Sequence, residues 1–399
     1  MIGKIARFRQ KFYAVPWCVP AWGRAEFGAT AKAIVTGRAV RGTAPGRFAA
    51  AVRDYLGVAY ALPLNRGRTA IEVGLRAMGI GPGDDVVLPS FICRSVLEAV
   101  QGAGANPVFA DIDETLNVTV TSVEAALTPK TKCVIVAHLF GTAAPVDEIA
   151  ARMTPRGIAV MDDAAQALGV RLRGRLVGSF GTCGIVCCGP GKPLAGAAGG
   201  VLVTNDKQVY DRAAAVPLGA EGGRDVRRRV RDFWVWRRFR RYTLPFKIML
   251  DRARRLRTEP AHVNAPMSNL DGAVALAQFA SIEGHAAARR RNAQLLVDRL
   301  ASLPGAMITD LAPTAMAVKL IYLLPDGTSV DAVIDSLASH GIEAQGGYGP
   351  LHAEHSPEGS LPVTAALWRR VLCVPVETKP PARDSVFGVR DSGRLRSQA

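Results

Sequence analysis

A single lysine, Lys192, stands in a segment of glycine, alanine and proline that runs from residue 189 to residue 200. Apolar runs flank this segment, so we expect a strand, a loop that presents Lys192, and a second strand. Small neighbours let a bulky group approach the backbone closely, and a lysine held there can lose its proton and act as an amine nucleophile. Taken by itself, the segment fits an exposed lysine in a surface loop equally well.

Acidic and basic side chains follow two other predicted strands. Asp162 and Asp163 close the apolar run 157–162, and the sequence Arg-Gly-Arg-Thr at 66–69 follows the run 60–64 and opens a helix. A helix N-terminus with two guanidinium groups beside it is a natural anion site. Ordinary helix capping is the alternative interpretation of both groups.

The ligands of open α/β sheets bind at the carboxyl ends of the strands, where these three groups would meet. An amine, an acid and an anion site are what pyridoxal phosphate (PLP) requires. The cofactor needs a lysine for covalent attachment, an acid that keeps its pyridine nitrogen protonated, and a cradle for its phosphate. Neither GxxxxGK[ST] nor GxGxxG is completed around Lys192, so a nucleotide loop of those kinds is not expected.

Apolar runs alternate with helical patterns through the first half of the chain, which predicts a doubly wound α/β fold. The predicted strands cover residues 60–64, 86–89, 107–112, 132–138, 157–162, 184–188 and 200–204. Predicted helices cover 45–56, 69–78, 95–102, 122–126 and 145–153. Strands this apolar, joined by helical crossovers, argue for a mostly parallel seven-stranded sheet covered on both faces.

The second half predicts a smaller α/β unit. A long helical pattern runs from about residue 270 to residue 303 and is followed by a strand at 317–324, a helix at 330–340 and a strand at 342–344. The tail after residue 380 is charged and contains glycine and serine, so we expect it to fray.

The composition describes a globular protein, because hydrophobic residues make up 49% of the 399 residues and charged residues 21%. No apolar run reaches the length of about 18 residues that a membrane span needs, and the N-terminus lacks the apolar stretch of a signal peptide. The seven cysteines form no zinc-binding pattern. We therefore expect no metal, reduced thiols and a cytoplasmic protein.

The net charge of +16 comes mostly from one segment, residues 224–257, which holds fourteen Arg and Lys against three Asp. Six aromatic residues are interleaved with these arginines. The mixture suits a peripheral contact with an anionic membrane at its inner face, a lid whose arginines grip a substrate's phosphates, or a solvated arm or dimer contact. No nucleic-acid-binding motif accompanies the charge, so we expect no nucleic acid partner.

Several ordered motifs carry a family resemblance. They are residues 79–90, 107–113, 138–141, 162–167, Lys192 with Gly199-Gly200, and 350–352. Over residues 20–375 the chain resembles the DegT/StrS-type sugar aminotransferases, which are fold-type I PLP enzymes. The resemblance implies a large PLP-binding domain at 21–265 that carries the basic insertion 224–257, and a small C-terminal domain at 266–380. A basic, aromatic segment at 1–20 and a tail at 381–399 flank them.

The resemblance also implies roles for individual residues. Lys192 would form the Schiff base with PLP and later move a proton between cofactor and substrate carbons. Asp163 would pair with the pyridine nitrogen, and Gln166 would contact the 3-hydroxyl of the ring. The backbone at Gly67 and Arg68 would hold the phosphate.

A further position, Asn264, matches a family residue that reaches the phosphate of the partner subunit. The resemblance therefore implies a homodimer with shared active sites. The implied reaction takes an amino group from an amino-acid donor such as glutamate and gives it to a keto-sugar linked to a nucleotide or another phosphate carrier. A PLP enzyme of another outcome, such as elimination or a non-sugar keto substrate, and a non-catalytic membrane-associated or regulatory relative are the alternatives.

The chain departs from the family pattern at several positions. Cys93 stands where the family usually stacks an aromatic residue on the ring, and Cys187 stands where a serine binds the phosphate. Leu168, Ala198 and Pro266 replace a frequent histidine, glutamate and arginine. These departures put the usual nucleotide-sugar substrate in question more than the cofactor, because Lys192, Asp163 and Gln166 all remain. Phosphate binding could also shift onto the Arg68 side chain.

Overall fold

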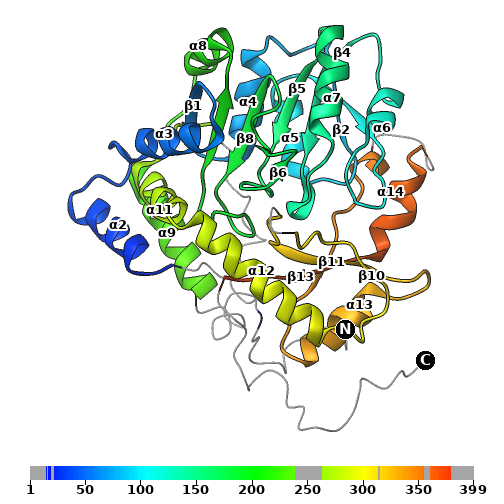
Figure 1. Ribbon diagram of the computed structural model, residues 1–399. Helices are drawn as coiled ribbons and strands as arrows, with labels where there is room; N and C mark the ends of the chain where they lie inside the picture. Colours follow the sequence, from blue (N-terminus) through cyan, green and yellow to red (C-terminus); the bar gives the residue numbers. More distant parts are fainter. Residues whose placement is uncertain are drawn as a thin grey trace.

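The computed structural model describes residues 15, 17–18, 22–238, 263–312, 315–354 and 360–378. Within them the chain forms a seven-stranded sheet, a smaller four-stranded sheet and a two-stranded hairpin. Figure 1 shows the large sheet, with its helices, above the small one. The basic, aromatic segment at 1–20 lies outside the described residues apart from residues 15, 17 and 18, and the tail 381–399 lies outside them entirely.

The large sheet consists of β1 (Tyr60–Leu64), β2 (Asp85–Pro89), β3 (Asn106–Ala110), β4 (Thr131–Ala137), β5 (Ala159–Asp163), β8 (Cys183–Cys187) and β9 (Gly200–Thr204). Their order is β1-β9-β8-β5-β4-β2-β3. All neighbours pair in parallel except at β9, which runs antiparallel to both β8 and β1. The predicted fold class is confirmed. The reversal at β9 makes residues 188–199, here called the lysine loop, a turn back across the carboxyl end of β8.

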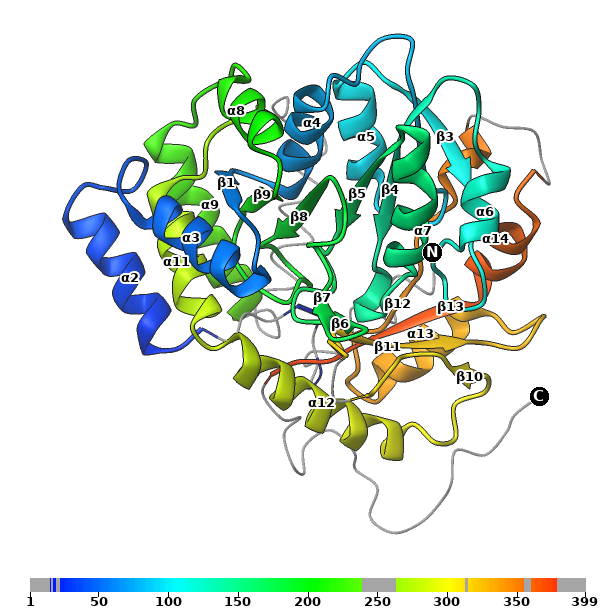
Figure 2. The same ribbon diagram turned by 45° about the horizontal axis from the view of Figure 1, so that its top comes forward.

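Helices cover both faces of this sheet (Figures 1 and 2). They are α3 (Ala44–Leu56), α4 (Gly67–Ala77), α5 (Arg94–Gly102), α6 (Val120–Ala125), α7 (Val146–Met153), α8 (Lys207–Ala215) and α11 (Asn269–Phe279). Successive strand residues point to opposite faces. Ile135 packs into the core under α4 and α5, whereas Val134 and Val136 pack into the core under α6 and α7. Burial on both faces explains why the strands are apolar throughout.

The small sheet is antiparallel, in the order β10-β11-β13-β12. Its strands are β10 (Ala306–Met307), β11 (Lys319–Leu323), β12 (Gln345–Gly346) and β13 (Val371–Pro375), and helices α12 (Ile282–Arg299) and α13 (Val330–Ser339) accompany it. Leu296, Leu337 and Leu372 share its core. The N-terminal segment joins this unit, since Val15 bridges Ile342 and the N–H of Trp17 donates to Glu343 Oε2 over 2.8 Å.

Two predicted elements differ in the structure. The single helix expected at 270–303 is wrong, because the chain breaks between α11 and α12, and Figure 2 shows the bend. At the break the N–H of Ser281 donates to Gln278 O, three residues back, which ends the α-helical pattern. The strand expected at 342–344 is displaced to β12, because Glu343 N–H donates to Val15 O and the N-terminal segment occupies that pairing position.

The remaining elements are α2 (Arg24–Val35), α9 (Gly223–Arg238), α14 (Pro362–Leu367), the hairpin β6 (Arg171–Leu172) and β7 (Arg175–Leu176), and four 3-10 turns, Leu139–Gly141, Thr154–Arg156, Leu351–Glu354 and Trp368–Arg370. The first part of the basic segment forms α9, which buries Val226 and Val230 against Leu270. Arg229 of α9 pairs with Glu221 and with buried Asp271. This part of the segment is therefore built into the fold, and residues 239–257 lie outside the described residues.

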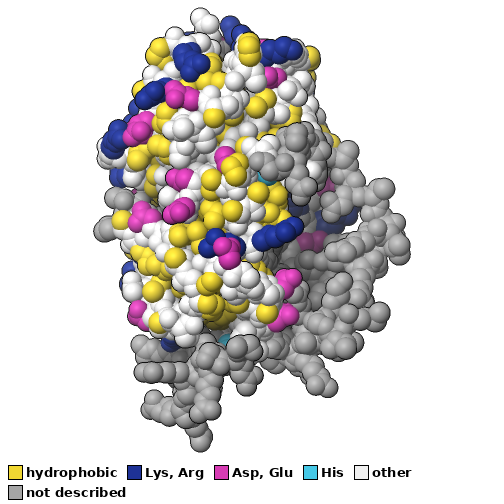
Figure 3. Space-filling view, turned by 90° about the vertical axis from the view of Figure 1, so that its right-hand side faces the viewer, with side chains coloured by type: hydrophobic (Ala, Val, Ile, Leu, Met, Phe, Trp, Pro, Cys, Tyr) yellow, Lys and Arg dark blue, Asp and Glu magenta, His cyan; other side chains and the backbone are white. Residues whose placement is uncertain are grey.

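The described surface shown in Figure 3 carries basic and acidic side chains side by side. Of the helices described here, none is both long enough and apolar enough to cross a membrane. No disulfide joins the seven cysteines, all of which fall in the described ranges.

Candidate active site

One cavity at the carboxyl ends of β4, β5 and β8 brings most of the predicted site residues together. It is lined by Gly67, Arg68, Cys93, Asp163, Gln166, Cys187 and Lys192, and also by His138. These residues come from the start of α4, the N-cap of α5, the ends of β4, β5 and β8, and the lysine loop. Asn264 does not line this cavity. It lies beyond β1, where its carbonyl accepts a hydrogen bond from the N–H of Gly219.

Lys192 is presented by a tight turn in the lysine loop. Its N–H donates to Gly189 O over 3.2 Å, and Gly191 adopts a φ of 74°, a value that a residue with a Cβ rarely adopts. Burial lowers the pKa of the Lys192 ammonium, but the neighbouring Tyr348, Cys187 and Asp163 outweigh burial, so that the pKa is raised. The amine is therefore held at the cavity as a cation until a ligand changes its surroundings.

Asp163 ends β5 with its carboxylate buried at the cavity. The N–H of Ala165 donates to Asp163 Oδ1 over 2.9 Å. Within the described ranges no group donates a hydrogen bond to the other carboxylate oxygen. Burial raises the pKa of Asp163, and the charge of Lys192 partly counteracts this effect. A buried carboxylate with an open acceptor suits a cationic N–H donor.

The N-terminus of α4 supplies backbone donors at the opposite end of the cavity. Gly67 opens the helix and lies next to Cys187. A Cβ at Gly67 would lie 3.1 Å from Cys187 Sγ, so the absence of a side chain keeps the backbone accessible there. The Arg68 guanidinium pairs with Glu98. The backbone and the helix dipole are thus the anion-binding elements at this end, and the Arg68 side chain is engaged elsewhere.

Gln166 is held in place by contacts from two sides. The N–H of Phe140 donates to Gln166 Oε1 over 3.4 Å, and Gln166 Nε2 donates to the Tyr348 hydroxyl over 3.3 Å. The Tyr348 ring stacks on the ring of Phe140, with centroids 5.7 Å apart. Tyr348 belongs to the smaller unit, so the site is completed across both units. The sequence reasoning missed this tyrosine, although it lies just before the motif at 350–352.

His138 is a second residue that the sequence reasoning left out of the site. Its Nδ1 accepts a hydrogen bond from the N–H of Ala144, so the proton is on Nε2, which donates to Asp162 Oδ1 over 2.6 Å. Asp162 also accepts from the N–H groups of Gly178 and Phe180. The position of His138 directly after β4, at the sheet edge where ligands bind, was the available signal.

Cys93 is the N-cap of α5 and half-buried, and its sulfur lies 3.2 Å from Ser95 Oγ. Cys187 is buried enough that its pKa is raised, although Lys192 lowers it in part. Both thiols line the cavity beside Lys192. A small, soft side chain at each position leaves room where a larger residue would fill the cavity.

Comparison with known proteins identifies the architecture and the family. Residues 22–384 match the DegT/DnrJ/EryC1/StrS aminotransferase family. The chain belongs to this family. Its fold is that of a PLP-dependent aminotransferase, and the resemblance seen in the sequence motifs is confirmed.

Individual relatives cover most of the chain. The GDP-perosamine synthase of Caulobacter vibrioides is 33% identical over 312 residues, 76% of each protein. A UDP-N-acetyl-3-dehydro-alpha-D-glucosamine 3-aminotransferase of Acidithiobacillus ferrooxidans is 30% identical over 335 residues, 82% of each protein. A crystal structure of a DegT/DnrJ/EryC1/StrS aminotransferase from Brucella abortus superposes with a TM-score of 0.70 at 26% identity, covering 89% of this chain and 90% of that one.

The cofactor of this aminotransferase is PLP. The cavity fits it: an amine at Lys192, an open buried acceptor at Asp163 and backbone donors at Gly67 surround one space. No group of three or more His, Cys, Asp and Glu in the described ranges is arranged to hold a metal ion.

Proposed function

We propose that this aminotransferase moves an amino group from an amino-acid donor, glutamate, to a keto-sugar that is linked to a nucleotide or another phosphate carrier. The single observation that carries the reaction class is the convergence of Lys192, Asp163 and Gln166 on one cavity in a chain of this family. The sugar class is supported by the names of two relatives, which include a GDP-linked and a UDP-linked sugar.

The proposed roles are those that the family resemblance implies, and the geometry is in accord with them. When bound, PLP supplies an electron sink and carries the amino group between donor and acceptor. Lys192 would hold the cofactor covalently, and its amine would move a proton at the reacting carbon. Asp163 keeps its open oxygen for the pyridine N–H, and its buried charge strengthens that contact. Gln166 would hold the ring through its 3-hydroxyl, and the backbone at Gly67 and Arg68 would hold the phosphate.

Two further residues act through others. His138 anchors Asp162 and so fixes the end of β5 next to Asp163. Tyr348 orients Gln166 from the smaller unit through its hydroxyl. Both are positioning residues in this proposal.

The reaction is tested by incubating the PLP-loaded protein with L-glutamate and a panel of GDP- and UDP-linked keto-sugars. Mass spectrometry should find an amino-sugar together with an equal amount of 2-oxoglutarate, and Lys192→Ala should abolish both. Loss of water from the sugar without an amino product would establish elimination instead. No turnover with any donor would favour a non-catalytic protein.

We further propose a homodimer with shared sites. A broad cleft of about 1240 Å³ opens from the cavity past Gly67, Arg68 and Lys192 to α9 and Val263. Asn264 lies beside this cleft and outside its own subunit's cavity, in accord with a role toward the partner subunit. Lys192→Ala and Asn264→Ala, each inactive alone, should regain part of the activity when mixed. Full activity in a monomer at low concentration would refute the shared site.

The location is proposed separately, as cytoplasmic with a peripheral contact at the inner membrane face. The support is the basic segment 224–257, of which Arg224, Arg227 and Arg228 are exposed on α9. Each basic residue near an anionic bilayer contributes about 1 kcal/mol. The protein should sediment with anionic vesicles and be released by salt. The alternative is a lid. In that case the protein does not bind vesicles, and replacing Arg237, Arg238, Arg240 and Arg241 with Ser raises the KM for the substrate.

A further inference from the structure

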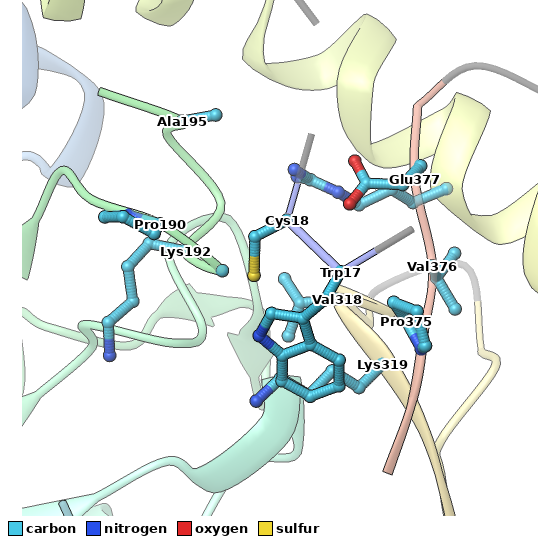
Figure 4. Close-up of a pocket in the computed structure, with 12 residues that line it drawn as sticks. Trp17, Cys18, Pro190, Lys192, Ala195, Val318, Lys319, Pro375, Val376 and Glu377 are labelled. Atoms are coloured by element: carbon cyan, nitrogen blue, oxygen red, sulfur yellow. The ribbon is translucent and has the colours of Figure 1, made fainter. Parts of the chain in front are cut away.

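A second, small cavity lies on the other side of Lys192, between the lysine loop and the small sheet. Its lining includes Trp17, Cys18, Lys192, Arg289, Lys319 and Glu377. In Figure 4 the Trp17 ring lies next to Lys319, and Lys192 comes from the opposite wall. The cavity measures about 20 Å³, on a scale where one water needs about 10–15 Å³. It accepts a group of a few atoms and excludes a nucleotide.

Lys319 presents an ammonium to this cavity from the first position of β11. Its Nζ lies 4.4 Å from the centroid of the Trp17 ring and 5.3 Å from that of Phe140, within the range of cation–π contacts. No described carboxylate lies within ion-pair distance of this ammonium. Glu343, which follows the residue that Val15 bridges, accepts a hydrogen bond from the N–H of Trp17. The rings therefore hold the cation in place and leave its charge uncompensated.

The rest of the lining adds to the positive potential. Arg289 is 5% exposed, its Nη1 donates to Pro193 O over 3.0 Å, and its Nε has no hydrogen-bond partner. With Lys319, two cations line a cavity to which one carboxylate, Glu377, contributes, while the amine of Lys192 points away toward the cofactor cavity. A small site with this excess of positive charge and a buried unpaired donor favours an anion.

We propose that Lys319 binds the α-carboxylate of the amino-acid donor. The donor's amino-bearing carbon reacts at Lys192, and the α-carboxylate is attached to that same carbon. The side-chain carboxylate of glutamate lies further along the molecule, and the phosphates of a sugar nucleotide lie across the sugar ring. Only the α-carboxylate is both small enough for the cavity and close enough to Lys192. This inference rests on the proposed function, because it assumes an amino-acid donor.

The test measures the donor half-reaction of the PLP-loaded protein by the loss of its visible absorbance. L-Glutamate is compared with its 1-amide, isoglutamine, and with L-glutamine, which keeps the α-carboxylate and lacks the side-chain one. The wild type should prefer glutamate over isoglutamine. Lys319→Met should lower kcat/KM for glutamate and for glutamine by about ten- to a hundredfold, and should leave isoglutamine unchanged, so that the preference disappears.

Binding gives a readout that does not depend on turnover. 2-Methyl-L-glutamate has no α-proton to lose, and its affinity, measured by calorimetry, should fall in Lys319→Met by a similar factor. Lys319→Arg keeps the cation and should retain most of the preference. Lys207→Met, an exposed lysine of α8 paired with Asp211, is the matched control and should change neither quantity. Thermal melting verifies that each variant is folded.

Three results would overturn the inference. They are an unchanged preference in Lys319→Met, a loss of the glutamine reaction that is no larger than the loss with isoglutamine, and a defect confined to the keto-sugar half-reaction. The last would place a sugar phosphate on Lys319. If Lys319→Met does not fold, an unchanged preference in Trp17→Leu, which removes the ring that holds the ammonium, would contradict the inference equally. If the wild type reacts with no amino donor, the proposed function is refuted instead. The wild type is therefore assayed before any variant.

Discussion

His138 Nε2 lies 2.6 Å from Asp162 Oδ1, and both side chains are fully buried. Because the imidazole Nδ1 accepts a backbone N–H, the ring is neutral and Asp162 carries the buried negative charge. Two backbone N–H groups, from Gly178 and Phe180, share that charge at 2.7 and 2.9 Å. The pair therefore ties the turn before β8 to the end of β5, one residue from the carboxylate that faces the cofactor cavity.

Replacing Asp162 by Asn should destabilise the protein by about 3 kcal/mol, because an amide leaves buried donors poorly satisfied. Urea unfolding of the protein without cofactor measures the change. Asp211→Asn, which removes an exposed ion pair with Lys207, should cost less than about 1 kcal/mol. Equal stabilities of the two variants would contradict the role assigned to the buried pair.

Gly141 is a backbone position that no residue with a side chain fits. It has a φ of 90°, and a Cβ there would lie 1.9 Å from the backbone oxygen of Met316. Gly141→Ala should therefore cost about 3 kcal/mol or more and disturb Phe140 next to it. Gly79 distinguishes backbone strain from steric overlap, because it has a φ of 76° and an added Cβ would have no atom within 4 Å. Gly79→Ala should therefore lose only the cost of the backbone strain, about 1 kcal/mol of stability. A similar loss of stability in Gly79→Ala and Gly141→Ala would show that the overlap with Met316 is unimportant.

Cys187 stands beside the helix N-terminus that we assign to the phosphate. Changing its thiol to a hydroxyl supplies a stronger donor to an anion, so Cys187→Ser should bind PLP about three- to tenfold more tightly. Titration of the protein stripped of cofactor, followed by tryptophan fluorescence, measures the affinity. Cys187→Ala removes the sulfur without adding a donor and should not tighten binding. Tightening in both variants would attribute the effect to space alone.

Two buried thiols predict a loss of stability at alkaline pH. Burial raises the pKa of Cys133 to about 12 and that of Cys373 to about 11, from a usual value of 9.0. Above pH 9 the unfolded chain releases these protons while the folded chain keeps them, so the free energy of unfolding falls as pH rises, by about 1.4 kcal/mol per pH unit and thiol. Between pH 9 and 11, Cys373→Ala should show a slope smaller by one proton. An unchanged slope would mean that Cys373 ionises normally.

The strands of the large sheet could be predicted from sequence because strands buried on both faces are apolar throughout, and all seven are present within about two residues of the expected ends. The helix break at Ser281 could not be predicted from the sequence, because the apolar periodicity continues through it. In the small sheet, β13 was missed although its five residues are all buried.

The candidate site shows the same division. Lys192, Asp163 and Gly67 follow strands that the pattern reveals, so their meeting at one edge could be expected. Lys319 and Trp17 are distant in the chain, and only the docking of the N-terminal segment on the small sheet brings them together. Tyr348 reaches Gln166 by the packing of the two units, which no local pattern encodes.

The central claim, that Lys192 holds PLP in this cavity, is tested most directly by the visible spectrum of the purified protein followed by borohydride reduction and peptide mapping. The protein should be yellow, should lose its colour when L-glutamate is added, and after reduction should carry the cofactor on the peptide that contains Lys192. Asp163→Asn should keep the fold and lose most turnover, since an amide cannot hold the ring nitrogen protonated. A colourless protein that takes up no added PLP, or a label on another lysine, would contradict the account.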